Sequence, residues 1–173
     1  MTGRNRANSG PGHAEVIGSA GKPPYIGLMF ESLFNTLFAS DPEPLDDGDA
    51  RLALTALLVR IARSDNDYAS VEIDEIEQIV AARYHLSQAE AVELRHAAEA
   101  FEAEAPDTVR FTRAIKEAVP YDQRLRVVES AWSVVLADGA RAEEENALMR
   151  LIASLLGIED RDSNIARKKA AQS

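Results

Sequence analysis

The strongest constraint on the fold of this chain is a short sequence pattern that occurs twice, 73 positions apart (65 to 138). In each copy an apolar stretch runs into an Asp-centred turn, and an amphipathic stretch with an acidic start follows. The copies contain Asp65-Asn66-Asp67 followed by Glu72, and Asp138-Gly139 followed by Glu145, so the Asp and the Glu are seven positions apart in both. The pattern predicts a helical hairpin that is used twice. We call its two bends the first acidic turn (Asp65-Asn66-Asp67) and the second acidic turn (Asp138-Gly139).

The rest of the chain carries the periodicity of helices. Apolar residues recur three and four positions apart in successive stretches, and no window alternates with period two as a strand would. These stretches are 30–38, 54–61, 73–80, 94–101, 111–119, 127–135 and 148–155. The sequence therefore predicts an all-α fold, a single compact bundle of about seven helices built on two pseudo-repeated helical hairpins.

Residues that start or stop helices divide these stretches. Ser87 and Glu90 have the spacing of a capping box, in which each side chain accepts a hydrogen bond from a backbone N–H at the start of a helix. Pro120 lacks a backbone N–H and is expected to end the helix before it. Gly157 is expected to end another helix by adopting a left-handed conformation. The last polar segment, which ends in Arg167-Lys168-Lys169, is predicted to be frayed.

The N-terminal part differs in composition from the rest. Residues 1–28 are dominated by Gly, Asn, Ser and Pro, and such a segment cannot bury enough apolar surface to order itself. Our hypothesis is that Met29 is the biological start and that the leader is not translated; peptides from 1–28 in mass spectra of the native protein would contradict it. The predicted division is a disordered leader over 1–28, a short amphipathic helix and linker over 29–48, a helical domain over 49–160 and a C-terminal tail over 161–173.

The predicted helix over 30–38 has one apolar stripe, which contains three of the five Phe residues. Its other face has no cation that could engage anionic lipid. We expect the stripe to pack on the body of the protein, with docking to a membrane surface or a partner as the alternative.

Composition narrows the functional classes. The chain has 19 Lys and Arg against 29 Asp and Glu, a net charge of −10, which repels phosphate backbones, so nucleic acid is not expected as a partner. The absence of cysteine excludes disulfides, thiolate nucleophiles and Cys-type zinc sites. No stretch approaches the roughly 20 apolar residues of a transmembrane helix, and residues 1–28 lack the apolar segment of a secretory signal. We expect a cytoplasmic protein.

The acidic turns are candidate sites for a divalent cation. Ca²⁺, Mg²⁺ and Mn²⁺ need several oxygen ligands that converge from a bent backbone. The candidate ligands are Asp65, Asp67 and Glu72 at the first turn and Asp138 and Glu145 at the second, with Glu143 and Glu144 as additional oxygens. The EF-hand template fails, since counting from Asp65 it requires Gly at Ser70 and Glu at Ile76. The alternative is that these side chains only cap turns and helices, which Asp and a first-turn Glu do without metal.

From about 49 to 160 the chain resembles the tellurite-resistance TerB-like family. The hallmark of that family is an Ala-Asp-Gly turn followed by a helix with Glu at this spacing. It is present here as Leu136-Ala137-Asp138-Gly139 through Glu145 and, in altered form, as Ser64-Asp65-Asn66-Asp67 through Glu72. The two copies are joined by a section, residues 106–111, that is similar to the middle section of the family. Together these features make the resemblance more specific than one short motif would.

The resemblance implies an all-helical bundle with no known catalytic activity, linked to resistance to tellurite and other stresses. It also implies metal binding through the acidic turn residues and a protein partner in the membrane, which would place this chain in the cytoplasm or at the inner face of the membrane. One departure is Asn66, where the family prefers Gly. Asn also tolerates the left-handed conformation and can supply an oxygen.

An enzyme and a metal-free scaffold are the alternatives. His13, His85 and His96 are the only histidines, and cysteine and a Gly-rich phosphate loop are missing. Only carboxylates remain as catalysts, so no enzymatic activity is expected. An acidic interaction scaffold would engage a basic protein partner through the charges near the turns, without any response to cations.

Overall fold

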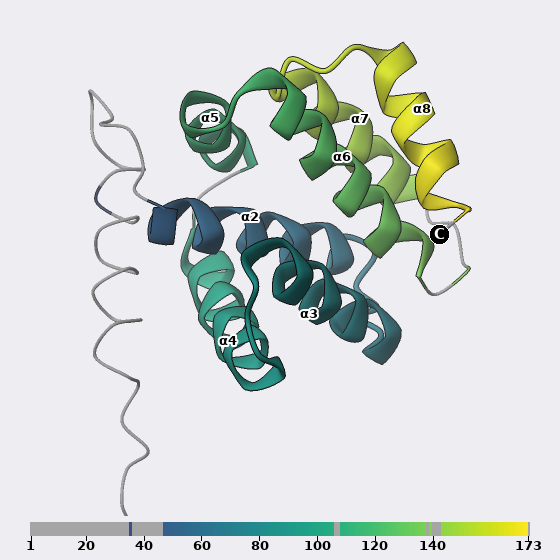
Figure 1. Cartoon of the computed structure of the whole chain (residues 1–173). Helices are drawn as coiled ribbons and strands as arrows, with labels where there is room; N and C mark the ends of the chain where they lie inside the picture. Colours follow the sequence, from purple (N-terminus) through teal and green to yellow (C-terminus); the bar gives the residue numbers. More distant parts are fainter. Residues whose placement is uncertain (1–34, 36–46, 106–107, 138, 140–142, 173) are drawn as a thin grey trace, which may run out of the picture.

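The computed structural model describes Asn35 and residues 47–105, 108–137, 139 and 143–172. Between residues 47 and 172 the described parts of the chain contain helices and no strand, which confirms the predicted all-α class. The helices are α2 (Asp47–Ala62), α3 (Ser70–Tyr84), α4 (Gln88–Glu104), α5 (Thr108–Ala118), α6 (Tyr121–Leu136), α7 (Glu143–Leu155) and α8 (Asp160–Ala170). Helix α2 runs through the middle of the molecule, with α3 and α4 on one side and α5 to α8 on the other (Figure 1).

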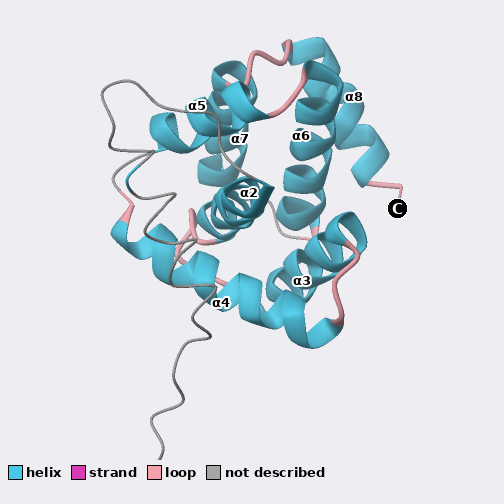
Figure 2. Ribbon diagram, turned by 60° about the vertical axis from the view of Figure 1, so that its left-hand side comes forward, coloured by secondary structure: helices cyan, strands magenta, loops and turns pink. Residues whose placement is uncertain are grey.

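Helix α2 is buried around its whole circumference. Every residue from Leu52 to Val59 is between 0 and 3% exposed, so this middle part of the helix has no solvent face, unlike a surface helix with a single apolar stripe. It contacts α3, α4, α5, α6 and α7, and Figure 2 shows it nearly end-on between them. Thr55, the polar residue in this run, donates its hydroxyl hydrogen to the carbonyl oxygen of Arg51 at 2.8 Å. Its burial therefore leaves no unpaired donor.

The two predicted hairpins are α2–α3 and α6–α7, and their second helices end in the same way. Left-handed residues stop them: His85 follows α3 with a φ of +55°, and Gly157 follows α7 with a φ of +72°. The next residues, Leu86 and Ile158, each donate a backbone N–H to the carbonyl five residues earlier, at 3.0 and 2.8 Å. This pairing closes the helix end and brings an apolar residue onto the core. The predicted stop at Gly157 is confirmed.

The other predicted boundaries are also present. The Ser87 N–H donates to Glu90 Oε2 at 2.8 Å, and the Glu90 N–H donates to Ser87 Oγ at 3.4 Å, which confirms the capping box at the start of α4. Pro120 lies between α5 and α6, as expected for a residue that cannot continue a helix.

The C-terminal segment is a packed helix, so the prediction of a frayed segment is wrong. Helix α8 lies against α6 and α7. Trp132 Nε1 on α6 donates to Ser163 Oγ at 3.2 Å, Ala166 is 3% exposed, and Lys169 Nζ lies 2.6 Å from Glu129 Oε1. A serine and an alanine make this contact instead of large apolar residues, so the apolar pattern is too sparse to predict the helix.

The predictions for the N-terminal part lie outside the described residues. These are the leader over 1–28, the start at Met29 and the helix over 30–38. The linker predicted over 29–48 ends earlier than expected, because α2 already begins at Asp47. None of the helices that the structure describes is long and apolar enough to cross a membrane.

Candidate functional site

The first acidic turn is a tight, hydrogen-bonded bend between α2 and α3. Asn66 has a φ of +68°, in the left-handed region that Asn tolerates better than most residues. Asp65 Oδ1 accepts a hydrogen bond from the Asp67 N–H at 2.8 Å, and the Asp67 carbonyl accepts one from the Ala69 N–H at 3.1 Å. The expectation that Asn66 can take the conformation of the family's Gly is confirmed.

Glu72 closes this bend from the side of α3. It is the third residue of the helix and only 2% exposed. Its Oε2 accepts a hydrogen bond from the Ala69 N–H at 2.9 Å. A carboxylate at this position reaches back to the N–H that precedes the helix, so Glu72 caps α3.

The second acidic turn repeats these features where the two can be compared. Gly139 has a φ of +73° and stands at the position equivalent to Asn66. Glu145 is the third residue of α7 and is 4% exposed. Glu72 has the same position in α3 and is also buried. Asp138 lies outside the described residues. The predicted repeat therefore extends to the backbone conformation and to the burial of the glutamate.

The carboxylates of the first turn do not converge on one point. Asp65 and Glu72 each use one oxygen to accept a backbone N–H. Asp67 is exposed, and its carboxylate forms no hydrogen bond or ion pair with another residue that the structure describes. Among the described residues, no three side chains of His, Asp or Glu lie close enough together to hold a metal ion. A cation at this turn would have one or two carboxylate ligands and would keep several waters, a coordination typical of Mg²⁺.

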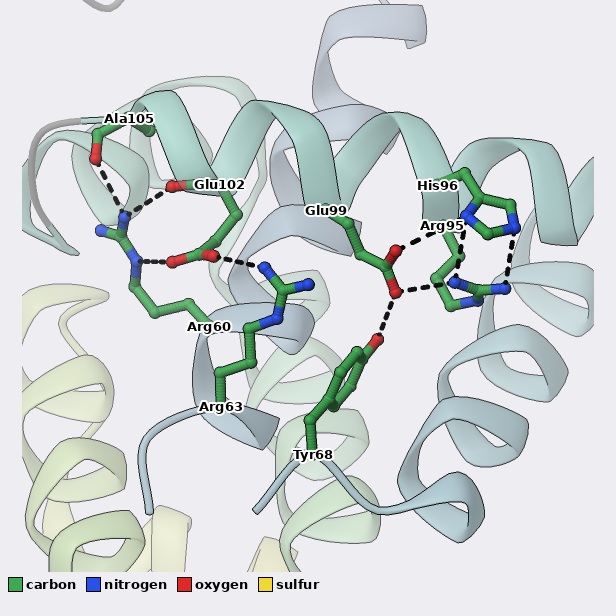
Figure 3. Close-up of polar contacts among 8 residues, drawn as sticks. All are labelled: Arg60, Arg63, Tyr68, Arg95, His96, Glu99, Glu102 and Ala105. Atoms are coloured by element: carbon green, nitrogen blue, oxygen red, sulfur yellow. Dashed lines mark hydrogen bonds and ion pairs between the residues drawn. The ribbon is translucent and has the colours of Figure 1, made fainter. Parts of the chain in front are cut away.

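A set of charged side chains fastens both ends of the first turn to α4 (Figure 3). Arg63 precedes the turn and donates from Nη1 to Glu102 Oε2 at 3.0 Å. Tyr68 follows the turn and donates its hydroxyl hydrogen to Glu99 Oε1 at 2.9 Å. Glu99 and Glu102 are three residues apart and therefore share one face of α4. The turn is thus held on both sides by the same helix face.

The same set extends to α2 and α3. Arg60 Nε lies 3.1 Å from Glu102 Oε1, and Arg95 lies 2.7 Å from both Glu77 Oε1 and Glu99 Oε1. The five side chains of these pairs are between 8 and 19% exposed. Ion pairs this far removed from water lose much when one partner is deleted, because the other charge is left buried and unpaired.

These contacts set the protonation of the two groups that meet the turn. Burial alone would raise the pKa of Glu99, but hydrogen bonds from Arg95 and Tyr68 and the charges of Arg95 and Arg63 outweigh it and hold the pKa below its ordinary value. Burial and the hydrogen bond to Glu99 raise the pKa of Tyr68. At neutral pH, Glu99 is therefore ionised and Tyr68 keeps the proton that it donates.

We call this set of side chains the α4 anchor, and it was not predicted from the sequence. It consists of Arg60, Arg63, Tyr68, Glu77, Arg95, Glu99 and Glu102. The signal that could have revealed it is the helical spacing of Arg60 and Arg63 near the end of one apolar helix. The spacing of Arg95, Glu99 and Glu102 on the next polar helix is a second signal. Which arginine meets which glutamate depends on how α2 packs on α4.

The fold and the two turns define a class of protein: an all-helical domain made of two like hairpins, each with a left-handed residue at its turn and a buried glutamate at the third position of the helix that follows. The profile of the family described as tellurite resistance protein TerB matches residues 51–168 of this chain. The chain therefore belongs to the TerB family, and its helical domain is a module related to tellurite resistance. No curated protein and no solved structure matches the chain.

Proposed function

We propose that this TerB domain is a non-enzymatic module that binds a divalent cation at its acidic turns. The observation that carries the proposal is the exposed carboxylate of Asp67, which has no hydrogen bond or ion pair with a described residue and stands next to an Asp65 that uses one oxygen inside the turn. The α4 anchor holds the backbone on both sides of these oxygens. A bend that is ordered in advance lowers the cost of arranging ligands around an ion.

The proposed ligands are Asp65 and Asp67 at the first turn and Asp138 at the second. Glu72 and Glu145 lie at the third position of α3 and α7, where Glu72 holds a backbone N–H. Their role in the proposal is to position the turns. Because few carboxylates converge, the expected ion is a hydrated Mg²⁺, or a Ca²⁺ or Mn²⁺ bound weakly.

Calorimetric titration of the full chain with Mg²⁺, Ca²⁺ and Mn²⁺ tests the proposal. The informative variant carries Asp65→Asn and Asp138→Asn. The amide oxygen of an asparagine at position 65 can still accept the Asp67 N–H, so the bend is kept while the charge is removed. Saturable heat in the wild type that disappears in this variant is the expected result.

A control variant separates site binding from general charge effects. Asp122→Asn with Asp160→Asn makes the same change in net charge at exposed first-turn positions of α6 and α8. It should bind the ions as the wild type does. Equal loss in the two variants, or no saturable heat with any of the three ions, would refute cation binding at the turns.

A metal-free interaction scaffold is the second candidate, and the hydrogen bonds of the turn favour it. Asp65 and Glu72 already hold backbone N–H groups, so their conformation requires no ion. In this function the acidic surface near the turns docks a basic protein partner in the cytoplasm, with a membrane-associated partner suggested by the resemblance to the family. A captured complex that dissociates with salt, equally with and without chelator, would support this candidate over the first.

A further inference from the structure

A second site of different chemistry lies away from the acidic turns, between the start of α2, the end of α3, α5 and α6. It is a pocket of 270 Å³ whose lining includes Arg51 and Arg83 together with the aliphatic side chains of Leu54, Ile115 and Val127. The three aliphatic residues are 1 to 3% exposed and belong to the hydrophobic core. The pocket therefore has an apolar floor that is part of the folded body and a charged rim.

The two arginines of the rim lie against one tyrosine ring and form no ion pair with a residue that the structure describes. Their guanidinium groups lie 5.1 Å (Arg51) and 5.8 Å (Arg83) from the centre of the Tyr84 ring, a cation–π arrangement that limits their freedom. Within the described part of the chain, neither forms an ion pair. In a chain of net charge −10, two arginines that line one pocket without an ion pair to a described residue mark a local positive site.

The other polar groups of the pocket limit the ligand charge. Asp47 and Gln123 also line it, so the formal charges of the described lining residues are two positive and one negative, a net of +1. This balance suits a monoanion better than a phosphate dianion. Guanidinium groups donate two parallel N–H groups to a carboxylate, which gives a directional contact.

We propose that this pocket binds a small monocarboxylate with a short aliphatic body, with Arg51 and Arg83 holding the carboxylate and Leu54, Ile115 and Val127 contacting the body. The volume of 270 Å³ lies just below the roughly 300 to 1,000 Å³ of pockets for drug-sized ligands. Since a water molecule takes up about 30 Å³ of the liquid, the pocket suits a ligand of about six to nine non-hydrogen atoms. Ligands of that size bind with dissociation constants of ~10 µM to ~10 mM. The site does not depend on the acidic turns or on any cation.

Titration of the full chain with acetate, butanoate, hexanoate and octanoate, followed by two-dimensional amide NMR, tests the assignment. Each methylene that enters the apolar floor should tighten binding about fourfold until the pocket is full. Hexanamide, which has the same body without the charge, should bind at least tenfold more weakly than hexanoate. Shifts of the backbone amides of Arg51, Arg83 and Gln123 should saturate together.

Two variants and a matched control decide the outcome. Arg51→Ala and Arg83→Ala should each weaken hexanoate binding about tenfold or more. Arg126→Ala removes the same charge from an exposed position on α6 and should leave binding unchanged. Thermal unfolding of each variant checks that the fold persists. Three results would overturn the assignment: no saturable shifts with any carboxylate, equal affinity for hexanoate and hexanamide, or equal loss in Arg51→Ala and Arg126→Ala.

Discussion

The two hairpins bend alike but are held by different neighbours. Asn66 and Gly139 are both left-handed, and each following helix has a buried glutamate at its third position. The first turn is anchored by Arg63 and Tyr68 to two glutamates of α4. In the second hairpin, the described polar contacts of Trp132 are with α8. The first hairpin therefore meets α4 through charged side chains, whereas the second meets α8 through a tryptophan of α6.

This difference separates what is local from what is tertiary. The bend depends on residues that are adjacent in the chain, so it can be duplicated with its sequence. The anchor depends on which helix lies beside the hairpin, and that helix differs between the copies. The first hairpin should therefore depend on buried charge, and the second on apolar and small-residue packing.

Arg95→Ala should produce the largest effect. It leaves Glu77 and Glu99 without their nearest cation in a poorly hydrated place, so we expect a loss of about 2 to 3 kcal/mol in the free energy of unfolding. Arg126→Ala on α6, whose ion pair with Asp122 is exposed, should cost less than about 0.5 kcal/mol. Urea unfolding followed by helical circular dichroism measures both. Equal losses would mean that the anchor is not the feature that distinguishes the first hairpin.

Removal of the two buried glutamates tests the equivalence of the bends. Glu72→Ala should cost about 1 to 2 kcal/mol because the Ala69 N–H loses its charged acceptor. Glu145→Ala should cost a similar amount if the equivalent position has the same role. Glu72→Gln keeps an oxygen acceptor and should lose less than half as much. Midpoints of urea unfolding at constant m-value provide the comparison. A Glu145→Ala variant as stable as the wild type would show that the two positions are not equivalent.

The left-handed positions should respond in parallel but more weakly. Gly139→Ala has open space for its Cβ among the described residues, none of which has an atom within 4 Å, so we expect its cost to come from backbone conformation, about 1 kcal/mol. Asn66→Ala should cost about the same. Gly139→Asn, which copies the residue of the first turn, should cost less than Gly139→Ala. Thermal unfolding of the three variants checks this order, which would fail if Gly139→Asn were the most damaging.

The sequence was sufficient for features that depend on near neighbours. The apolar period predicted the all-α class, the duplicated pattern predicted the two hairpins, and Gly157 predicted the end of α7. Helix α8 was missed because its contacts use Ser163 and Ala166, which carry little apolar signal. The capping of α3 by Glu72 was one of two alternatives that its spacing allowed, and the choice required the hydrogen bond to the Ala69 N–H.

The surroundings of the candidate sites could not be predicted, because they combine residues from several helices. Arg63 and Tyr68 flank the first turn in sequence, but their partners are more than 30 positions away on α4. The pocket that contains Arg51 and Arg83 likewise needs α2 and α3 to meet α5 and α6. Spacing gives the side chains of one helix face, whereas packing decides which faces meet.

The last comparison concerns two tyrosine–carboxylate contacts, one partly buried and one exposed. Tyr68→Phe removes the hydrogen bond to Glu99 at 2.9 Å beside the first turn, and we expect a loss of about 0.5 to 1.5 kcal/mol at pH 7. Tyr121→Phe removes an exposed contact with Asp162 and should give no measurable change. Chemical unfolding at pH 7 compares the two variants. A loss in Tyr121→Phe as large as that in Tyr68→Phe would contradict the view that burial gives the first contact its strength.

The pH dependence of the Tyr68→Phe effect sharpens this last comparison. Because the pKa of Glu99 is lowered in the folded protein, its contribution to stability is present above the pKa of an unfolded Glu, about 4.3, and is lost as pH falls through the folded value. Without the Tyr68 hydroxyl, the pKa of Glu99 should move back toward its ordinary value. The stability difference between wild type and Tyr68→Phe should therefore be full near pH 7 and shrink below about pH 4. A difference that stays constant from pH 7 to pH 3 would show that the Tyr68 hydroxyl contributes independently of the charge of Glu99, because Phe keeps the ring over which Arg63 lies.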